Sequence, residues 1–248
     1  MSSPYAQQGF RARFDWGPAG AGEIGGGARF VAVIDVLSFT TALTVAVERG
    51  IEVYPYRWRD ESAAEYARAR DAVLAVGRSE ADGPGRVSLS PATILRSQGI
   101  RRIVLPSPNG STIAQGLAAQ GATVIGVCLR NFHAAARWVA NALGPDDVVA
   151  VIASGERWKS DGGSLRPALE DLWGAGAFLQ ALGIEGSPEA EAAVAAWDRF
   201  GGRPPLAECA GGRELIAYGY PEDVEVAAEV GSSEAVPVLS GESFTAGA

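Results

Sequence analysis

The sequence predicts an α/β protein with three layers, in which helices cover both faces of a mainly parallel sheet. Short apolar runs rich in Val and Ile alternate with segments of helical spacing between residues 30 and 182, as in repeated βα units. Three further segments with helical spacing follow, which predicts a helical carboxyl-terminal third. We expect residues 1–248 to form a single unit, and two α/β lobes within it are an alternative arrangement.

The elements can be placed in chain order. Residues 30–34 are apolar at every position, which is typical of a strand buried on both faces. Similar runs predict strands near 30–35, 51–56, 73–77, 101–105, 123–128, 147–153 and 236–239. Apolar residues three and four positions apart predict helices near 39–49, 60–71, 111–120, 132–143, 165–182, 188–200, 206–218 and 221–230.

Composition excludes several classes of function. No run of about 18 apolar residues is present, so we expect no membrane span. The net charge is −8 and the sole basic cluster is Arg101-Arg102, so the basic surface of a nucleic-acid binder is missing. The amino terminus lacks the apolar segment of a secretion signal, and the two cysteines lie far apart. We therefore expect a cytoplasmic protein.

Asp35 comes directly after the first buried strand. In open α/β sheets, ligands bind at the carboxyl ends of the strands, so a carboxylate in this place is a candidate functional group. Thr40 and Thr41 follow at the start of the next predicted helix. The alternative is that Asp35 and Thr40 only cap this helix, because short polar residues are favoured at helix starts.

A second strand-to-helix junction carries the stretch PSPNGST. Backbone N–H groups at a helix start, together with small hydroxyls and a glycine, make an anion-binding site. The candidate residues are Ser107, Asn109, Gly110, Ser111 and Thr112. The alternative is an ordinary Asn-Gly turn with Ser111 as a helix cap. We expect this junction and Asp35 to lie at the same edge of the sheet.

A third junction follows the strand near 147–153 and carries Glu156 and Arg157. In the helix expected over 165–182, the core-facing stripe would leave Glu170 and Asp171 on other faces. That stripe consists of Leu165, Leu169, Leu172, Gly176 and Leu179. Adjacent acids in a helix are usually solvated, but carboxylates are also the usual ligands of Mg²⁺.

Two other segments have recognisable patterns. Residues 77–91 are rich in turn-forming residues and long for a connection, so they form either a substrate loop or lid, or a flexible excursion. Residues 20–25, GAGEIG, match the spacing of a dinucleotide-binding fingerprint. They precede the first strong strand instead of following one, which excludes that function.

What is absent narrows the chemistry further. His133 is the sole histidine, which excludes a typical zinc site, and neither Cys128 nor Cys209 lies in a C-x5-R phosphate loop. The sequence has no G-x-x-x-x-G-K-[ST] loop of an NTPase. The remaining carboxylates, hydroxyls, arginines and helix amino termini suit metal-assisted hydrolysis of an anionic ester.

Four stretches resemble motifs of the ComB-like 2-phosphosulfolactate phosphatase family. The first, VIDVLSFTTAL, is similar to the family signature D-V-L-R-x-[TS]-T, and the second, PSPNGST, is similar to its T-T-N-G-T turn. The third, LEDLWGAGAFL, resembles the family helix L-E-D-x-x-C-A-G, and the fourth is GRELIAYGYPEDVEVAAEV followed by VPVL. They occur in family order between residues 31 and 239, which makes the resemblance specific.

The resemblance implies an Mg²⁺-dependent phosphatase that converts 2-phospho-3-sulfolactate to 3-sulfolactate, a step toward coenzyme M. The matching motif residues are Asp35, Thr40, Thr41, Asn109, Gly110, Thr112, Glu170, Asp171, Arg213 and Asp223. By resemblance, Asp35, Glu170 and Asp171 would bind the metal or activate water. Thr40, Thr41 and the amides of 109–112 would hold the phosphate, and a second anionic group would be offset by Arg78, Arg157 or Arg213.

The chain departs from the family motifs at two places. Ser38 stands where the family has an arginine, and the family's G-N-S-P segment appears as LSPAT, which keeps Ser90 and Pro91. We therefore expect a small anionic phosphomonoester as the ligand, either 2-phosphosulfolactate or a related phosphorylated hydroxy acid. A homodimer is compatible with the sequence.

Two rival functions remain. An aspartyl phosphatase of the haloacid-dehalogenase type normally has a second Asp two residues after the first, where this chain has Leu37. The other rival is a non-catalytic relative that binds an anion as a sensor. This alternative stays open because Ser38 replaces the family's arginine.

Overall fold

The computed structural model describes residues 3–57, 60–81, 86–107, 109–118, 121–160 and 162–247. In this part of the chain a nine-stranded sheet has the order β1-β7-β2-β6-β10-β11-β3-β5-β4, and β8 and β9 form a separate hairpin. The strands are β1 (Ala12–Trp16), β2 (Phe30–Ile34), β3 (Glu52–Tyr56), β4 (Val73–Leu74), β5 (Arg102–Pro106), β6 (Thr123–Val127), β7 (Val149–Ala153), β8 (Glu156–Arg157), β9 (Leu165–Arg166), β10 (Pro237–Ser240) and β11 (Ser243–Ala246).

The α-helices alternate with the strands as far as α7 and then follow one another. They are α1 (Gly17–Ile24), α2 (Phe39–Glu48), α3 (Glu61–Arg68), α4 (Pro91–Arg96), α5 (Gly110–Ala118), α6 (Phe132–Ala142), α7 (Leu169–Leu182), α8 (Pro188–Asp198), α9 (Ala210–Ala217) and α10 (Pro221–Ala227). Short 3₁₀ turns are η1 (Pro4–Ala6), η2 (Arg78–Glu80) and η3 (Leu206–Glu208). No described helix is both long enough and apolar enough to span a lipid bilayer.

The sheet consists of two parallel groups joined by an antiparallel hairpin. In one group β1 pairs with β7, β7 with β2 and β2 with β6, all parallel. In the other group β5 pairs in parallel with β3 and β4. The hairpin β10–β11 lies between the groups, because β10 is antiparallel to β6 and β11 is antiparallel to β3. The prediction of a mainly parallel sheet is confirmed.

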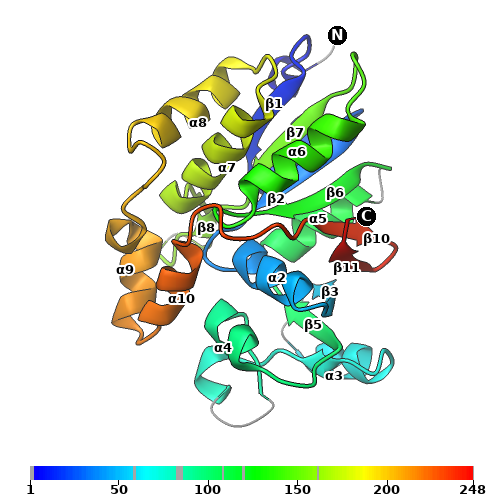
Figure 1. Ribbon diagram of the computed structural model, residues 1–248, viewed down its shortest axis with the longest axis vertical. Coiled ribbons are helices and arrows are strands. Elements are labelled where there is room, and N and C mark those ends of the chain that lie inside the picture. The colour runs from blue at the N-terminus through cyan, green and yellow to red at the C-terminus, as the bar shows by residue number, and fades with distance from the viewer. Residues whose placement is uncertain are drawn as a thin grey trace.

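Two apolar cores lie on opposite faces of the sheet, which confirms the three layers. Alternate residues of β2 point into different cores, as the pleat of a strand requires. Ala32 and Ile34 pack with Phe178 of α7, whereas Val31 and Val33 pack with residues of α1, α2 and α5. Figure 1 shows α6 and α7 in front of this part of the sheet and α5 behind it.

Several elements were not predicted. β1 and α1 precede the first predicted strand, so the expectation that the GAGEIG segment follows no strand is wrong: it lies mostly within α1, which begins directly after β1. α4, β11 and the hairpin β8–β9 were also missed. Each of these elements is short, so its sequence contains too few repeats of the helical or the strand spacing of apolar residues to be recognised. The helical carboxyl-terminal third is confirmed in α8, α9 and α10, although the segment predicted over 206–218 is divided into η3 and α9.

The predicted stripe of the third-junction helix is wrong at its start. Residues 165–166 form β9, so α7 begins at Leu169. Leu165 and Leu169 are 39% and 51% exposed, whereas Glu170 and Asp171 are buried. The reason is that α7 packs against α6, α8 and the sheet at once, so it has no single polar face.

The contact between α7 and α8 gives a test of this packing. A Cβ atom at Gly176 would overlap the carbonyl oxygen of Ala193, so the helices can approach closely because residue 176 has no side chain. Gly176→Ala should lower the free energy of unfolding by about 1–3 kcal/mol in urea denaturation. The matched control is Gly22→Ala in α1, where a Cβ meets nothing within 4 Å. That variant should be stabilised by about 0.5–1 kcal/mol, and equal effects in the two variants would contradict the close packing.

Candidate active site

The loops that follow β2 and β7 are joined by one carboxylate from α7. Asp171 is 3% exposed. Its Oδ1 accepts the N–H of Val36 at 2.8 Å and its Oδ2 accepts the N–H of Gly155 at 2.9 Å. The parallel register of β2 and β7 brings the two loops side by side. In this structure Asp171 therefore holds both loops in place, and metal binding by it stays a prediction.

Asp35 lies in the loop after β2 and is 8% exposed. Its Oδ1 accepts the N–H of Phe39, the first residue of α2, at 3.1 Å. Asp35 therefore does cap this helix, as the structural alternative predicted, through one of its contacts. Burial, with smaller contributions from the charges of Glu156 and Glu170, raises the pKa of Asp35 to about 7, while hydrogen bonds from the N–H groups of Phe39 and Gly110 oppose the shift. Burial and the charges of Asp35 and Glu170 likewise raise the pKa of Asp171 well above its ordinary value. Four acids, Asp35, Glu156, Glu170 and Asp171, thus form one acid cluster.

The junction after β5 reaches this cluster by an unexpected path. β6, β10, β11 and β3 separate β5 from β2 in the sheet, so the two strand ends are not neighbours. α5 closes the distance, because a Cβ atom at Gly110 would lie 2.9 Å from Asp35 Oδ2. The side chain of Asn109 donates from Nδ2 to the carbonyl oxygen of Gly155 at 3.3 Å. The three predicted junctions do meet, and the first residues of α5 bring the second junction to the other two.

The hydroxyl groups at these junctions hold the backbone. Thr40 Oγ1 donates to the carbonyl oxygen of Asp35 at 2.8 Å, and Thr41 Oγ1 donates to that of Val36 at 2.7 Å. Ser111 Oγ donates to the carbonyl oxygen of Leu105 at 3.3 Å. In this arrangement the three hydroxyl protons point at carbonyl groups, so these residues position the loops. Substrate binding by them stays a prediction.

The other two residues of the second junction differ in burial. Ser107 is buried, and its N–H donates to the carbonyl oxygen of Tyr56 at 2.9 Å. Thr112 is partly buried in the first turn of α5. Substrate binding by Ser107 and Thr112 stays a prediction.

A cavity of about 630 Å³ adjoins the acid cluster, because Glu156 and Glu170 are part of its wall. The cavity lies between the loop after β2, the hairpin β8–β9 and α9. Its basic side chains are those of Arg78, Arg157, Lys159 and Arg166. Arginine and lysine in the wall of an open cavity suit a ligand with more than one anionic group, and the acids in the same wall are Glu156, Glu170 and Glu214. Arg213, a predicted substrate contact, is exposed on α9 and is not part of this wall.

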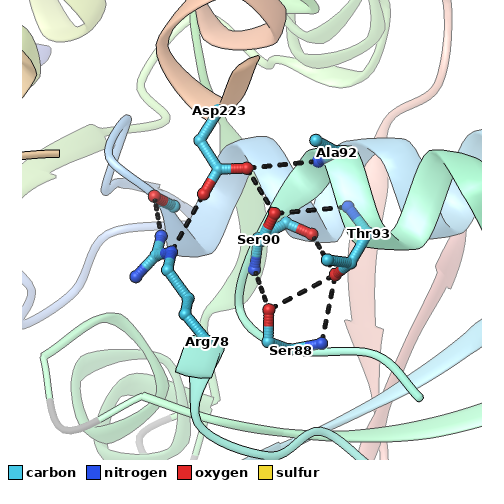
Figure 2. Close-up of polar contacts among 7 residues, drawn as sticks. Arg78, Ser88, Ser90, Ala92, Thr93 and Asp223 are labelled. Carbon is cyan, nitrogen blue, oxygen red and sulfur yellow. Dashed lines mark hydrogen bonds and ion pairs between the residues drawn. The ribbon is translucent and has the colours of Figure 1, made fainter. Parts of the chain in front are cut away.

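Arg78 is held by a buried network that Figure 2 shows. Its Nε donates to Asp223 Oδ2 at 2.9 Å, and its Nη2 donates to Ser38 Oγ at 2.7 Å. Asp223 is 1% exposed, and its Oδ1 also accepts the hydroxyl of Ser90 and the N–H of Ala92. The network joins α10 to α4, η2 and the loop after Asp35.

The same segment that was predicted as a substrate loop or lid also lines a second cavity, of about 600 Å³. Within residues 77–91, η2 carries Arg78, and Ser90 caps α4 by accepting the N–H of Thr93. Residues 82–85 of this segment lie outside the described residues. Arg78 belongs to the walls of both cavities.

Sequence reasoning missed two residues beside the site. Glu156 belongs to the acid cluster, but a single acid in a polar loop has no distinguishing pattern. Ser154 is buried directly after β7, and its N–H donates to the carbonyl oxygen of Ile34 at 2.7 Å. Its hydroxyl finds no hydrogen-bond partner among the described residues.

The two thiols have raised pKa values. Burial raises the pKa of Cys128, and burial together with the nearby charge of Glu170 raises that of Cys209 to about 12. Cys209 Sγ donates to Glu170 Oε2 at 3.2 Å. A thiolate nucleophile needs a lowered pKa, so this geometry agrees with the sequence-based exclusion of a thiol mechanism.

Comparison with known proteins places these residues in a family. A family model described as 2-phosphosulpholactate phosphatase matches residues 23–242. The chain belongs to this family. The family's members are phosphoric monoester hydrolases. A probable 2-phosphosulfolactate phosphatase of Thermus thermophilus is 34% identical over 219 residues, which cover 85% of this chain and 88% of the relative. One of Deinococcus radiodurans is 30% identical over 226 residues, covering 87% and 90%.

The acid cluster can be compared with the metal that the family resemblance implies. Among the residues that the structure describes, no group of three or more His, Cys, Asp and Glu side chains is arranged to hold a metal ion. Mg²⁺ commonly uses one or two carboxylates and completes its shell with water and substrate phosphate. Asp35 and Glu170 supply such oxygen donors, so the donor chemistry fits Mg²⁺ in this mode.

The raised pKa of Asp35 predicts how stability depends on pH. The unfolded chain loses this proton near the ordinary pKa of 3.8, whereas the folded protein keeps it up to about 7. The folded state therefore binds more protons in this window, and its stability falls as pH rises. In EDTA, the free energy of unfolding should fall between pH 4 and pH 7, by at most about 4 kcal/mol for Asp35.

The control for this prediction is Asp35→Asn, which removes the titrating group but keeps an acceptor for the N–H of Phe39. Its stability should depend less steeply on pH, with the remaining slope due to Asp171. A wild-type protein whose stability rises over the same range would contradict the assignment.

Ser154 gives a second test. A buried hydroxyl without a partner costs free energy, so Ser154→Ala should raise the free energy of unfolding by about 1 kcal/mol in urea denaturation. The matched control is Ser111→Ala, which removes a buried hydroxyl that does donate a hydrogen bond and should lower stability by about 1 kcal/mol. An equal loss in both variants would mean that Ser154 has a partner in solution.

Proposed function

We propose that this chain hydrolyses 2-phospho-3-sulfolactate, or a closely related phosphorylated hydroxy acid, to the hydroxy acid and phosphate, with Mg²⁺ as cofactor. The observation that carries the proposal is the acid cluster beside a cavity walled by four basic side chains. A substrate of this class has a phosphate and further anionic groups, which matches basic side chains in the cavity. The family and its two named relatives support the same reaction.

The residues divide into two roles. Asp35, as a carboxylate, would accept a proton from the attacking water, the role of a general base. Asp35 and Glu170 would also hold Mg²⁺, which when bound would supply positive charge to offset that of the phosphate. The basic side chains of the cavity would bind the anionic groups of the substrate. Asp171 would keep the loops after β2 and β7 at a constant separation through its two hydrogen bonds.

Turnover by purified protein tests the proposal. With Mg²⁺, a panel of small phosphomonoesters should be hydrolysed with 2-phosphosulfolactate preferred, and excess EDTA should abolish the activity. Asp35→Asn should lower kcat by about a thousandfold, the scale of an essential polar group, with an unfolding midpoint no lower than that of the wild type. Asn caps a helix about as well as Asp, so a purely capping Asp35 would leave activity intact.

The matched control is Asp147→Asn. Asp147 also accepts a backbone N–H, from Gly144, but it pairs with Arg29 and lies outside the acid cluster. Its activity should equal that of the wild type. Full activity in EDTA would end the metal hypothesis. Anion binding without any turnover would favour the non-catalytic sensor instead.

A further inference from the structure

We propose that Arg78 binds an anionic group of the substrate other than the phosphate, and that Asp223 is the positioning residue that aims it. This inference rests on the proposed function and names the side chain that sets substrate selectivity. The sequence leaves three arginines open for the task, namely Arg78, Arg157 and Arg213. Their surroundings in the structure separate them.

Arg157 and Arg213 are poorly placed for selective binding. Both are exposed, and Arg213 is not part of the cavity wall. Arg157 Nη1 donates to the carbonyl oxygen of Gly163 at 2.8 Å, a contact between residues only six positions apart. Ordering an exposed arginine on binding costs conformational entropy, which reduces the gain from the contact.

Arg78 is fixed before any ligand arrives. Its side chain is 21% exposed and is anchored at Nε by Asp223 and at Nη2 by Ser38. Nη1 has no acceptor among the parts of the chain that the structure describes, so two N–H groups there remain for a ligand, along with the second one of Nη2. A planar guanidinium held in this way can bind two oxygens of a sulfonate or carboxylate at once.

The position of Arg78 links it to the acid cluster. Ser38 lies three residues after Asp35, and its hydroxyl accepts Nη2 of Arg78 at 2.7 Å, so the guanidinium reaches this loop. The family motif has an arginine at position 38, and this chain has Ser38. Arg78 therefore supplies a positive charge to the loop from another part of the chain. Arg78 is part of the wall of the cavity beside the acid cluster. If the substrate phosphate lies beside Asp35, the other anionic groups of a small substrate can therefore reach Arg78.

Asp223 sets the direction of this side chain. Its carboxylate is buried and receives hydrogen bonds from Ser90 and Ala92 on one oxygen, while the other oxygen takes Nε of Arg78. These contacts hold the carboxylate from α4, so Arg78 can rotate little about its end group. Asp223 has no place in the wall of the cavity beside the acid cluster, and it acts on substrate through Arg78.

Three substrates measured with Arg78→Gln test the proposal. They are 2-phosphosulfolactate, 2-phospholactate, which lacks the sulfonate, and 2-phosphooxyethanesulfonate, which lacks the carboxylate. Loss of one charge-assisted contact should lower kcat/KM about 10- to 100-fold, mostly through KM, for substrates that carry the bound group. The analogue without that group should be nearly unaffected, which identifies the group. An equal fall for all three, or no change, would overturn the proposal.

Asp223→Asn tests the positioning role. It should raise KM for the same substrates as Arg78→Gln and spare the same analogue, which a general loss of stability would not do. Arg78→Lys should not restore selectivity, because an ammonium cannot present the planar fork. The matched control is Arg137→Gln on α6, which breaks an exposed ion pair with Glu234 and should behave as the wild type.

Binding of 3-sulfolactate by calorimetry separates failure of this inference from failure of the proposed function. If the wild type hydrolyses none of the substrates, the proposed function fails, and weaker 3-sulfolactate binding by Arg78→Gln than by wild type would still support the role of Arg78. Equal binding by the two proteins, or no binding by either, would overturn it.

Discussion

The site depends on one buried carboxylate, that of Asp171, which joins the loops after β2 and β7. Both of its oxygens accept backbone N–H groups, so two N–H groups that would otherwise be buried without a partner are hydrogen-bonded. One of these loops carries Asp35, and the other leads into the hairpin β8–β9 that forms part of the cavity wall. The position of Asp35 relative to the hairpin side of the cavity wall therefore follows from contacts made by a single residue of α7.

Acidic and basic side chains meet at this point, because Glu156 and Glu170 of the acid cluster also belong to the cavity wall. Four acids lie together where burial raises the pKa values of Asp35 and Asp171, which destabilises the folded state at neutral pH. The basic side chains lie on the cavity side, and only some of them have a carboxylate partner, as Arg78 has in Asp223 and Lys159 in Glu214. Buried acids with raised pKa values are unfavourable for stability alone and are typical of a functional site.

The sequence predicted those parts of the fold and site that depend on neighbouring residues. Asp35 could be found because it ends an apolar run, and the three junctions could be found because each follows a strand. The burial of Glu170 and Asp171 could not be predicted, because helical periodicity assumes one solvated face and α7 is enclosed by α6, α8 and the sheet. The Arg78–Asp223 pair spans 145 residues, and local spacing carries no information on such a contact.

The hairpin β10–β11 imposes an order on the folding of the newly made chain. The two parallel groups of strands are complete by residue 153, but the sheet joins them only through residues 237–246. Val238 pairs with Ile125, and Phe244 pairs with Val53. During synthesis, β6 and β3 therefore present unpaired edges until these last strands leave the ribosome. Unpaired edges invite pairing with other chains, so the nascent protein passes through an interval in which chaperones would protect it.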